Sequence, residues 1–190
     1  MAQIRISQLE GDEMLKVMYP LNAYAFRPSP PLFDREDWMN AVRGRKGVMY
    51  FALFENDNPV AGVASSSMTQ MVRGKSFPMG GIWGVATHPG SRRKGYSRQL
   101  MSELLAALRE AGIPLSGLYP FRESFYERLG YIAFPQSLKA RFPTAALDSL
   151  VKRDLKGDVE IQPIAEAFDI YQEYLGMIQK HIHGMAMFNF

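Results

Sequence analysis

The residues best suited to chemistry lie in one stretch, Ile82 to Arg98, which reads IWGVATHPGSRRKGYSR. Its apolar start predicts a strand, Pro89–Gly90 predicts a turn, and three consecutive cations precede a helix that begins near Ser97. The first N–H groups of a helix lack partners within the helix, and the helix dipole places partial positive charge there. Gly95 lets the backbone approach an anion closely, because no Cβ stands in the way. A strand, a basic loop and a helix N-terminus in this order predict a pyrophosphate-binding site.

The spacing of this loop is close to that of a nucleotide-binding P-loop. Gly90 to Ser97 nearly matches G-x-x-x-x-G-K-[ST], but Tyr96 stands where the phosphate-neutralising lysine belongs. No apolar run ending in a magnesium-binding aspartate follows the loop, so an NTPase is the remote alternative. An ordinary capped helix is a weak interpretation, because cations at a helix N-terminus oppose the dipole unless an anion binds there.

A second spacing fits better. Arg92-x-x-Gly95-x-Ser97 resembles the pyrophosphate loop of the GCN5-related N-acetyltransferases (GNATs), which is usually written [QR]-x-x-G-x-[GA]. Ser97 departs from the final glycine or alanine, but it is still small, and its hydroxyl can itself donate to a phosphate. The resemblance implies that the pyrophosphate belongs to coenzyme A and that the cosubstrate is acetyl-CoA.

A second group of residues follows in Tyr119 to Tyr131, YPFRESFYERLGY. On composition alone, Tyr126 is more often a packed aromatic than a catalyst. In the GNAT superfamily, however, a tyrosine in an F-Y-x-x-x-G-[FY] segment lies beside the coenzyme A sulfur and protonates it. That role is reasonable in magnitude, because proton transfer from a phenol to a thiolate is uphill by only about 2 kcal/mol. The resemblance therefore implies that Tyr126 is the general acid.

Together, GVATHPGSRRKGYSRQLM and LYPFRESFYERLGY resemble the enhanced intracellular survival (Eis) acetyltransferases, over about residues 1 to 142. The resemblance implies that the backbone of Val85, Ala86 and Thr87 contacts the acetyl carbonyl and pantetheine. It implies that the phosphates are bound by Arg92, Arg93, Lys94, Gly95, Tyr96, Ser97 and Arg98. It also implies a further pair of coenzyme contacts, Phe121 and Arg122.

The same resemblance implies an acceptor amine on an aminoglycoside, a polyamine-like molecule or a lysine side chain. Eis proteins are about twice as long as this chain, and the terminal carboxylate of the full chain is their general base. The carboxylate of Phe190 is therefore not expected to be its equivalent, and the base is unassigned; Glu123 and Glu127 are nearby but are more often surface charges. Two interpretations are open for the aromatic residues around the proline-rich loop, which either line a substrate cleft or pack in the core or a lid. These residues are Tyr24, Phe26 and Phe33. A non-catalytic acyl-CoA-binding or assembly domain is the alternative from another class.

Composition restricts the partners. The 190 residues suit one domain, and a net charge of +3 is too small to indicate nucleic acid or membrane binding. The absence of cysteine excludes disulfides and thiolate metal sites, and the three histidines are not spaced as ligands, so no metal is expected. No signal peptide and no membrane-length apolar run is found, which favours the cytoplasm. The oligomeric state is open, with a homo-oligomer among the options.

The elements that position these residues follow from periodicity. Strands are expected near 3–8, 48–54, 60–71, 77–87, 115–119 and 131–142, and helices near 11–25, 34–43, 96–112 and 121–129. This order predicts an α/β fold with one mixed sheet, the GNAT acyltransferase fold, over residues 1–142. Residues 143–190 form a C-terminal extension, with helices near 145–152 and 165–180 and a strand near 159–164. By the resemblance, the extension coincides with the start of a second acetyltransferase-like region.

Overall fold

The computed structural model describes residues 2–27, 34–133, 139–153, 156–158 and 160–189. The chain divides into two units, one of Met1–Arg122 with Ile178–Phe190 and the other of Glu123–Met177. The domain boundary predicted between residues 142 and 143 falls inside the second unit, and that division stays a prediction.

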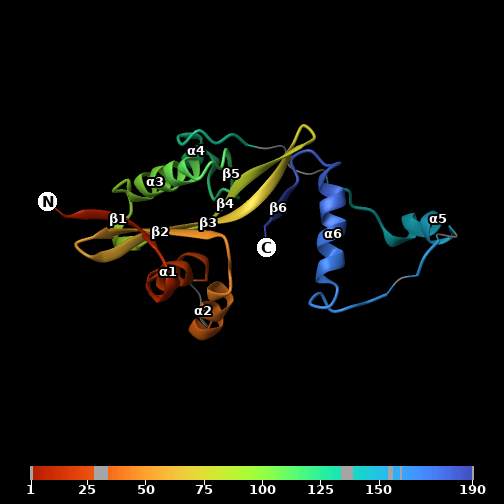
Figure 1. Ribbon diagram of the computed structural model, residues 1–190, viewed down its shortest axis with the longest axis horizontal. Helices are drawn as coiled ribbons and strands as arrows, with labels where there is room; N and C mark the ends of the chain where they lie inside the picture. Colours follow the sequence, from red (N-terminus) through yellow and green to blue (C-terminus); the bar gives the residue numbers. More distant parts are fainter. Residues whose placement is uncertain (1, 28–33, 134–138, 154–155, 159, 190) are drawn as a thin grey trace. The chain divides into compact units, whose positions relative to one another are not determined.

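A mixed sheet forms the centre of the first unit (Figure 1). Its strands are β1 (Ile4–Leu9), β2 (Val48–Glu55), β3 (Asn58–Val72), β4 (Lys75–Thr87) and β5 (Leu115–Gly117), in that order across the sheet, while β6 (Ala186–Phe188) pairs with β3. All pairs are antiparallel except β4 with β5, which are parallel. The β2–β3 hairpin turns at Asn56 and Asp57, which both have positive φ, as tight hairpin turns require.

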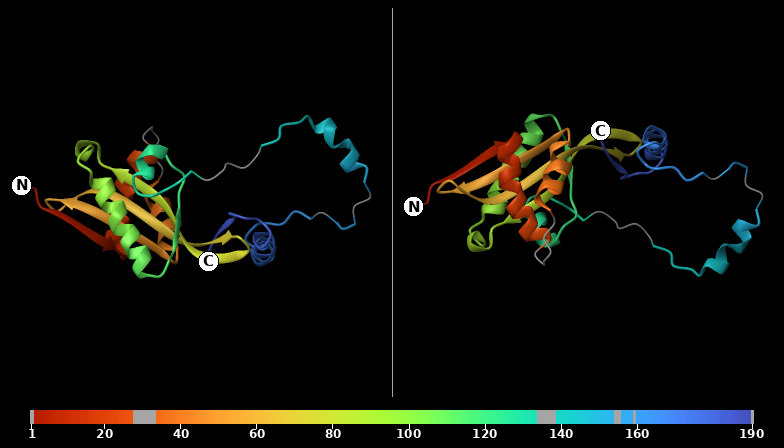
Figure 2. Two further views of the ribbon diagram at one scale, coloured as in Figure 1. Left: turned by 90° about the horizontal axis from the view of Figure 1, so that it is seen from above. Right: turned by 90° about the horizontal axis from the view of Figure 1, so that it is seen from below.

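Helices cover both faces of this sheet. α1 (Gly11–Phe26) and α2 (Arg35–Arg43) lie on one face, and α3 (Tyr96–Glu110) lies on the other (Figures 1 and 2). The strand β2 serves both layers, because successive side chains of a strand point to opposite faces. Tyr50, Ala52 and Phe54 join the α1 core, so Phe51 and Leu53, which are equally buried, face α3. This double burial explains why β2 is a continuous apolar run in the sequence.

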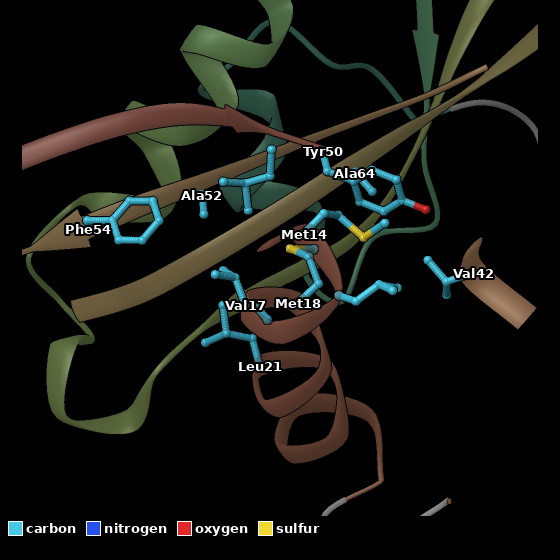
Figure 3. Close-up of a cluster of buried hydrophobic side chains, with 12 residues drawn as sticks. Met14, Val17, Met18, Leu21, Val42, Tyr50, Ala52, Phe54 and Ala64 are labelled. Atoms are coloured by element: carbon cyan, nitrogen blue, oxygen red, sulfur yellow. The ribbon is translucent and has the colours of Figure 1, made fainter. Parts of the chain in front are cut away.

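The core beneath α1 is built from its apolar stripe (Figure 3). Met14, Leu15, Met18 and Leu21 recur at helical spacing and pack against β2, β3 and β4. Met18 is fully buried, and its sulfur lies 2.8 Å from the position a Cβ would take on Gly62. The glycine therefore lets α1 approach β3 closely.

The strand β4 contains a bulge next to Val85, Ala86 and Thr87, the residues expected to contact the coenzyme. Gly62 pairs with Ala86 and Ala64 pairs with Trp83, so β4 has one extra residue opposite β3. Gly84, in this bulge, has a φ of +66°, which a residue with a Cβ rarely adopts. The parallel ladder with β5 has three pairs and ends at Gly81 with Gly117, while β4 continues to Thr87.

The second unit contains α4 (Glu123–Glu127), a 3-10 turn over Thr144–Leu147, α5 (Asp148–Val151) and most of α6 (Phe168–Gln179). The strand predicted at 131–142 is wrong for residues 131–133 and 139–142, which are not in a strand, and residues 134–138 lie outside the described part. The strand predicted at 159–164 is likewise wrong for 160–164, and Val159 is not described. Their β-favouring residues lack a paired ladder, which is what makes a strand.

The predicted mixed α/β sheet is confirmed, and so are the strands and helices predicted for residues 3–117. The predicted helix at 165–180 begins later, at Phe168, because Pro163 first accepts the amide hydrogens of Glu166 and Ala167 in a turn. No helix within the described ranges is long and apolar enough to cross a membrane.

Candidate functional site

The basic loop joins β4 to α3. After Thr87, a 3-10 turn over Pro89–Ser91 leads into residues 92–95, and α3 begins at Tyr96. Arg93 and Gly95 have φ values of +65° and +81°, so the backbone is left-handed at two of three consecutive residues. Gly95 is the N-cap of α3, and no side chain in the described part of the chain caps this helix. The Arg98 N–H donates to the Gly95 carbonyl at 3.1 Å, so the N–H groups of Tyr96 and Ser97 are the ones left for a ligand or solvent.

Space is open around Gly95. No heavy atom of the described residues lies within 4 Å of the position a Cβ would take there, apart from its chain neighbours. The side chains of Arg92, Arg93 and Arg98 are exposed beside it. The structure therefore brings together the open glycine, the uncapped helix and three of the four predicted cations.

The fourth cation, Lys94, is held by a residue that sequence reasoning missed. Its Nζ donates to both carboxylate oxygens of Glu55, at 2.8 and 2.9 Å. The Tyr96 hydroxyl donates to the same carboxylate at 2.6 Å, and the Ser91 hydroxyl does so at 3.2 Å. Glu55 ends β2 and lies 36 to 41 residues away from its partners, so no local pattern could have indicated the contact.

These hydrogen bonds change the acid–base properties of the group. The bonds from Lys94 and Tyr96 hold the pKa of the Glu55 carboxyl below its ordinary value. The carboxylate in turn raises the pKa of Lys94 and of Tyr96. At neutral pH the group is therefore an ion pair with a protonated phenol. The Tyr96 side chain also offers no positive charge at the position where a P-loop has lysine.

Ser97 and Thr87 connect the two ends of the loop. Their hydroxyl oxygens are 2.5 Å apart, so one donates to the other across the gap between β4 and α3. Only one of the two hydrogens is used in this contact, and the other hydroxyl hydrogen is available to a ligand. Arg92 lies over the ring of Tyr24 in α1, with 5.6 Å between the guanidinium carbon and the ring centroid.

Beyond Gly81, no strand of the described residues pairs with β4 on the side of β5. The His88 N–H donates to the Val60 carbonyl at 2.7 Å, so the backbone of His88 faces β3. Alternation along an antiparallel strand directs the backbone groups of Thr87, and of Val85 two residues earlier, to the opposite edge. Ala86 between them is buried in the α1 core. The edge is therefore able to accept an extended ligand as an additional strand.

A pocket of about 340 Å³ lies at the C-terminal end of α1 and the start of α2. It is lined by Asn22, Phe26, Arg27, Asp34, Asp37 and Trp38. Asn22 also reaches the β4 bulge, since its Oδ1 lies 3.2 Å from the position of a Cβ on Gly84. Of the three aromatics considered for a substrate cleft, Phe26 lines this pocket, Tyr24 is half-exposed beneath Arg92, and Phe33 lies outside the described residues.

The remaining predicted residues lie further along the chain. Phe121 and Arg122 follow β5 and are exposed. Tyr126 lies in α4 of the second unit, where its ring is buried against Phe125 and Tyr131 with centroids 4.9 and 5.9 Å apart. Burial raises the pKa of the Tyr126 phenol, and Tyr131 raises it further. The pairing of Tyr126 with a coenzyme sulfur stays a prediction.

Over the described ranges, no group of three or more histidine, aspartate or glutamate side chains is able to hold a metal ion.

The sequence was compared with family models and with known proteins, and both comparisons match acetyltransferases. A family model described as an acetyltransferase (GNAT) domain matches residues 5–133. The uncharacterized N-acetyltransferase ycf52 of Porphyra purpurea is 36% identical over 63 residues, which are 32% of this chain and 36% of that protein.

Solved structures share the fold. A conserved protein of unknown function from Enterococcus faecalis V583, described as a probable N-acyltransferase, has a TM-score of 0.61 and 28% identity over 69% of this chain and 32% of its own. A GCN5-related N-acetyltransferase from Kribbella flavida has a TM-score of 0.58 and 28% identity over 68% of this chain and 33% of its own. Eis1 from Mycobacterium abscessus has a TM-score of 0.54 and 19% identity, and the match covers 68% of this chain and 31% of Eis1. At this identity the similarity concerns the fold alone. The matches span about a third of the length of these relatives.

Proposed function

Because the chain belongs to the acetyltransferase (GNAT) domain family, we propose that it transfers an acetyl group from acetyl-CoA to a primary amine. The observation that carries this proposal is the basic loop at the uncapped start of α3, placed beside a β4 edge that β5 has left open. Acetyl-CoA supplies an acetyl group activated as a thioester. The residues of the loop and of β4 bind and orient it.

The loop fits a pyrophosphate in charge and in space. Arg92, Arg93 and Arg98 supply exposed positive charge, and the first N–H groups of α3 supply donors beside the open Gly95. Lys94 and Tyr96 contribute through their backbone, since Glu55 holds their side chains. Whichever of Ser97 and Thr87 keeps a free hydroxyl hydrogen adds a further donor. Phe121 and Arg122 complete the proposed coenzyme contacts.

The β4 edge suits the arm that carries the acetyl group. The backbone N–H and C=O groups of Val85 and Thr87 pair with the amides of an extended arm as another strand would. An N–H of the same edge polarises the acetyl carbonyl, which favours attack by an amine. Ala86 stays in the core and anchors this edge.

The pocket at α1 and α2 suits an amine acceptor. The two carboxylates of Asp34 and Asp37 outweigh the one guanidinium of Arg27, so the lining has a net negative charge that attracts a cation. Phe26 and Trp38 offer apolar and π surface. Asn22 joins this pocket to the bulge at Gly84, beside the edge proposed for the acetyl group. An acidic, aromatic site of this kind favours the acceptors implied by the Eis resemblance, an aminoglycoside, a polyamine-like molecule or a lysine side chain.

Tyr126 is proposed as the general acid. As the amine nitrogen bonds to the acetyl carbon, the carbon–sulfur bond breaks; the amine loses one proton and the thiolate gains one. A phenol whose pKa is raised by burial keeps its proton at neutral pH and is able to supply it. The base that takes the proton from the ammonium is left unassigned, and residues 1–142 are proposed as the catalytic domain.

Thiol release from acetyl-CoA tests the proposal. Wild-type protein is mixed with acetyl-CoA and a panel of aminoglycosides, polyamines and lysine peptides, and free thiol is followed with a chromogenic disulfide. Release that depends on an amine is expected. Binding of coenzyme A without release above background for any amine would refute the enzyme and favour the non-catalytic acyl-CoA-binding domain instead.

A further inference from the structure

Glu55 is the only carboxylate in the described part of the chain for which a hydrogen bond to the basic loop is found. We propose that Glu55 is a positioning residue that holds residues 91–96 in the shape that binds an anion. The identity of that anion rests on the proposed function, but the effect on the loop does not.

The partners of Glu55 are spaced to fix the strained part of the loop. Ser91 precedes Arg93, Lys94 lies between Arg93 and Gly95, and Tyr96 follows Gly95. A left-handed backbone is unfavourable for arginine, because its Cβ crowds the following carbonyl, and it persists only where the surroundings impose it. One carboxylate that binds a side chain before, between and after these two residues imposes it.

The contacts are close and partly shielded from water. The Glu55 side chain is 16% exposed, and Tyr96, which packs at the start of α3, is 8% exposed. An exposed pair of charges alone contributes little, because water screens it and two long side chains must be immobilised. Here one carboxylate is shared by three donors at 2.6 to 3.2 Å, and one of these donors is the hydroxyl of the buried residue Tyr96.

The negative charge of Glu55, taken by itself, predicts the opposite effect on anion binding from a positioning role, so the two effects can be distinguished. A carboxylate near an anion site repels the anion, so removing its charge should strengthen binding if Glu55 has no other role. Glu55 also offsets the charge of Lys94 and leaves the three arginines exposed. A positioning role predicts weaker binding in spite of the removed negative charge.

The test compares Glu55→Gln, which keeps the size of the side chain, with Asp57→Asn. Asp57 lies two residues further in the same hairpin, and asparagine tolerates its positive φ. Tyr96→Phe and Lys94→Met each remove one partner of Glu55. Hydrogen–deuterium exchange of the amides of residues 91–98 is measured without ligand. Titration calorimetry then gives the Kd for coenzyme A and for inorganic pyrophosphate.

We expect faster exchange of the loop in Glu55→Gln, with the rest of the protein unchanged. The Kd for coenzyme A should rise by about tenfold, the order of a lost hydrogen bond to a charged group, and KM for acetyl-CoA should rise with kcat unchanged. Asp57→Asn should alter none of these. Unchanged loop exchange, or a lower Kd in Glu55→Gln, would overturn the positioning role. Failure of the wild type to bind coenzyme A would instead overturn the proposed function, and loop exchange would then decide on Glu55.

Discussion

The Asn22 side chain and the Gly84 backbone meet where α1 crosses the bulge of β4. The Oδ1 atom of Asn22 lies 3.2 Å from the position that a Cβ on Gly84 would take, and its Nδ2 donates to the Met18 carbonyl at 2.8 Å. A buried amide, which donates to the backbone of its own helix, therefore lies against the bulge from the helix side. Asn22 also lines the pocket proposed for the acceptor, so this side chain lies between that pocket and the strand edge proposed for the acetyl group.

The first prediction concerns Gly84→Ala. The new Cβ would contact Asn22, and the alanine would have to adopt a φ of +66°. The free energy of unfolding should therefore fall by about 1–3 kcal/mol. Urea denaturation followed by circular dichroism measures the change. Gly44→Ala is the control, since Gly44 has an ordinary φ of −75° and an added Cβ there meets no described atom within 4 Å. Equal stability of the two variants would show that the bulge does not require glycine.

Local signals in the sequence were sufficient for much of this site. The strands expected near 48–54 and 60–71, the helix expected near 96–112 and the glycine before that helix each depend on residues within a few positions, and the structure has them where they were predicted. The predicted mixed sheet includes β4 and β5, which pair in parallel across the helix between them.

Contacts between distant residues were not predictable in this way. Glu55 was not among the predicted site residues, and its bonds to Lys94 and Tyr96 depend on how the whole sheet folds. The pairing of β6 with Met68–Gln70 likewise joins segments more than 110 residues apart. The strand predicted at 131–142, which is wrong for the described residues 131–133 and 139–142, failed for the same reason, since β-favouring residues form a strand only where a neighbour pairs with them.

A second prediction tests the core beneath α1. Met18 is fully buried against Gly62, so Met18→Ala should lower the free energy of unfolding by about 2–5 kcal/mol. Chemical denaturation measures the loss. Lys16→Ala, on the exposed side of the same helix, should change stability by less than about 0.5 kcal/mol. A loss of similar size in both variants would mean that the burial of Met18 against Gly62 does not set the effect, since alanine favours a helix at either position.

The general acid is tested by Tyr126→Phe. Phenylalanine keeps the buried ring and its contacts with Phe125 and Tyr131 but removes the proton donor. The kcat should fall by about 10²- to 10⁴-fold while KM for acetyl-CoA changes little. Stopped-flow thiol release measures the chemical step directly. Tyr119→Phe, at a fully exposed position, should retain wild-type turnover. A wild-type kcat in Tyr126→Phe would remove this residue from the mechanism.

The acid stability of the loop should depend on Glu55. Its pKa is lowered in the folded protein, so its contribution is complete above its unfolded pKa of about 4.3 and is lost as the pH falls through the lower folded pKa. Lys94 and Tyr96, the titratable groups that face it, stay protonated throughout that range. The protection factors of the loop amides, which take account of the slower intrinsic exchange in acid, should therefore fall as the pH is lowered in the wild type and not in Glu55→Gln. Parallel pH profiles of the two proteins would contradict this expectation.

The acidic pocket should select cationic acceptors. Asp37 lines it, so Asp37→Asn should raise KM for a polyamine by more than it raises KM for a monoamine, because a charge acts most strongly on the more highly charged ligand. The difference should shrink at high salt, since exposed charges are screened beyond about 10 Å at 0.1 M ionic strength. Asp12→Asn is the matched control, because Asp12 is an exposed acid that pairs with Arg43 and does not line the pocket. Steady-state kinetics at two salt concentrations measure both effects. If Asp37→Asn and Asp12→Asn gave the same KM values, attraction by this pocket would not be what brings the amine to the enzyme, and the acceptor would have to bind elsewhere.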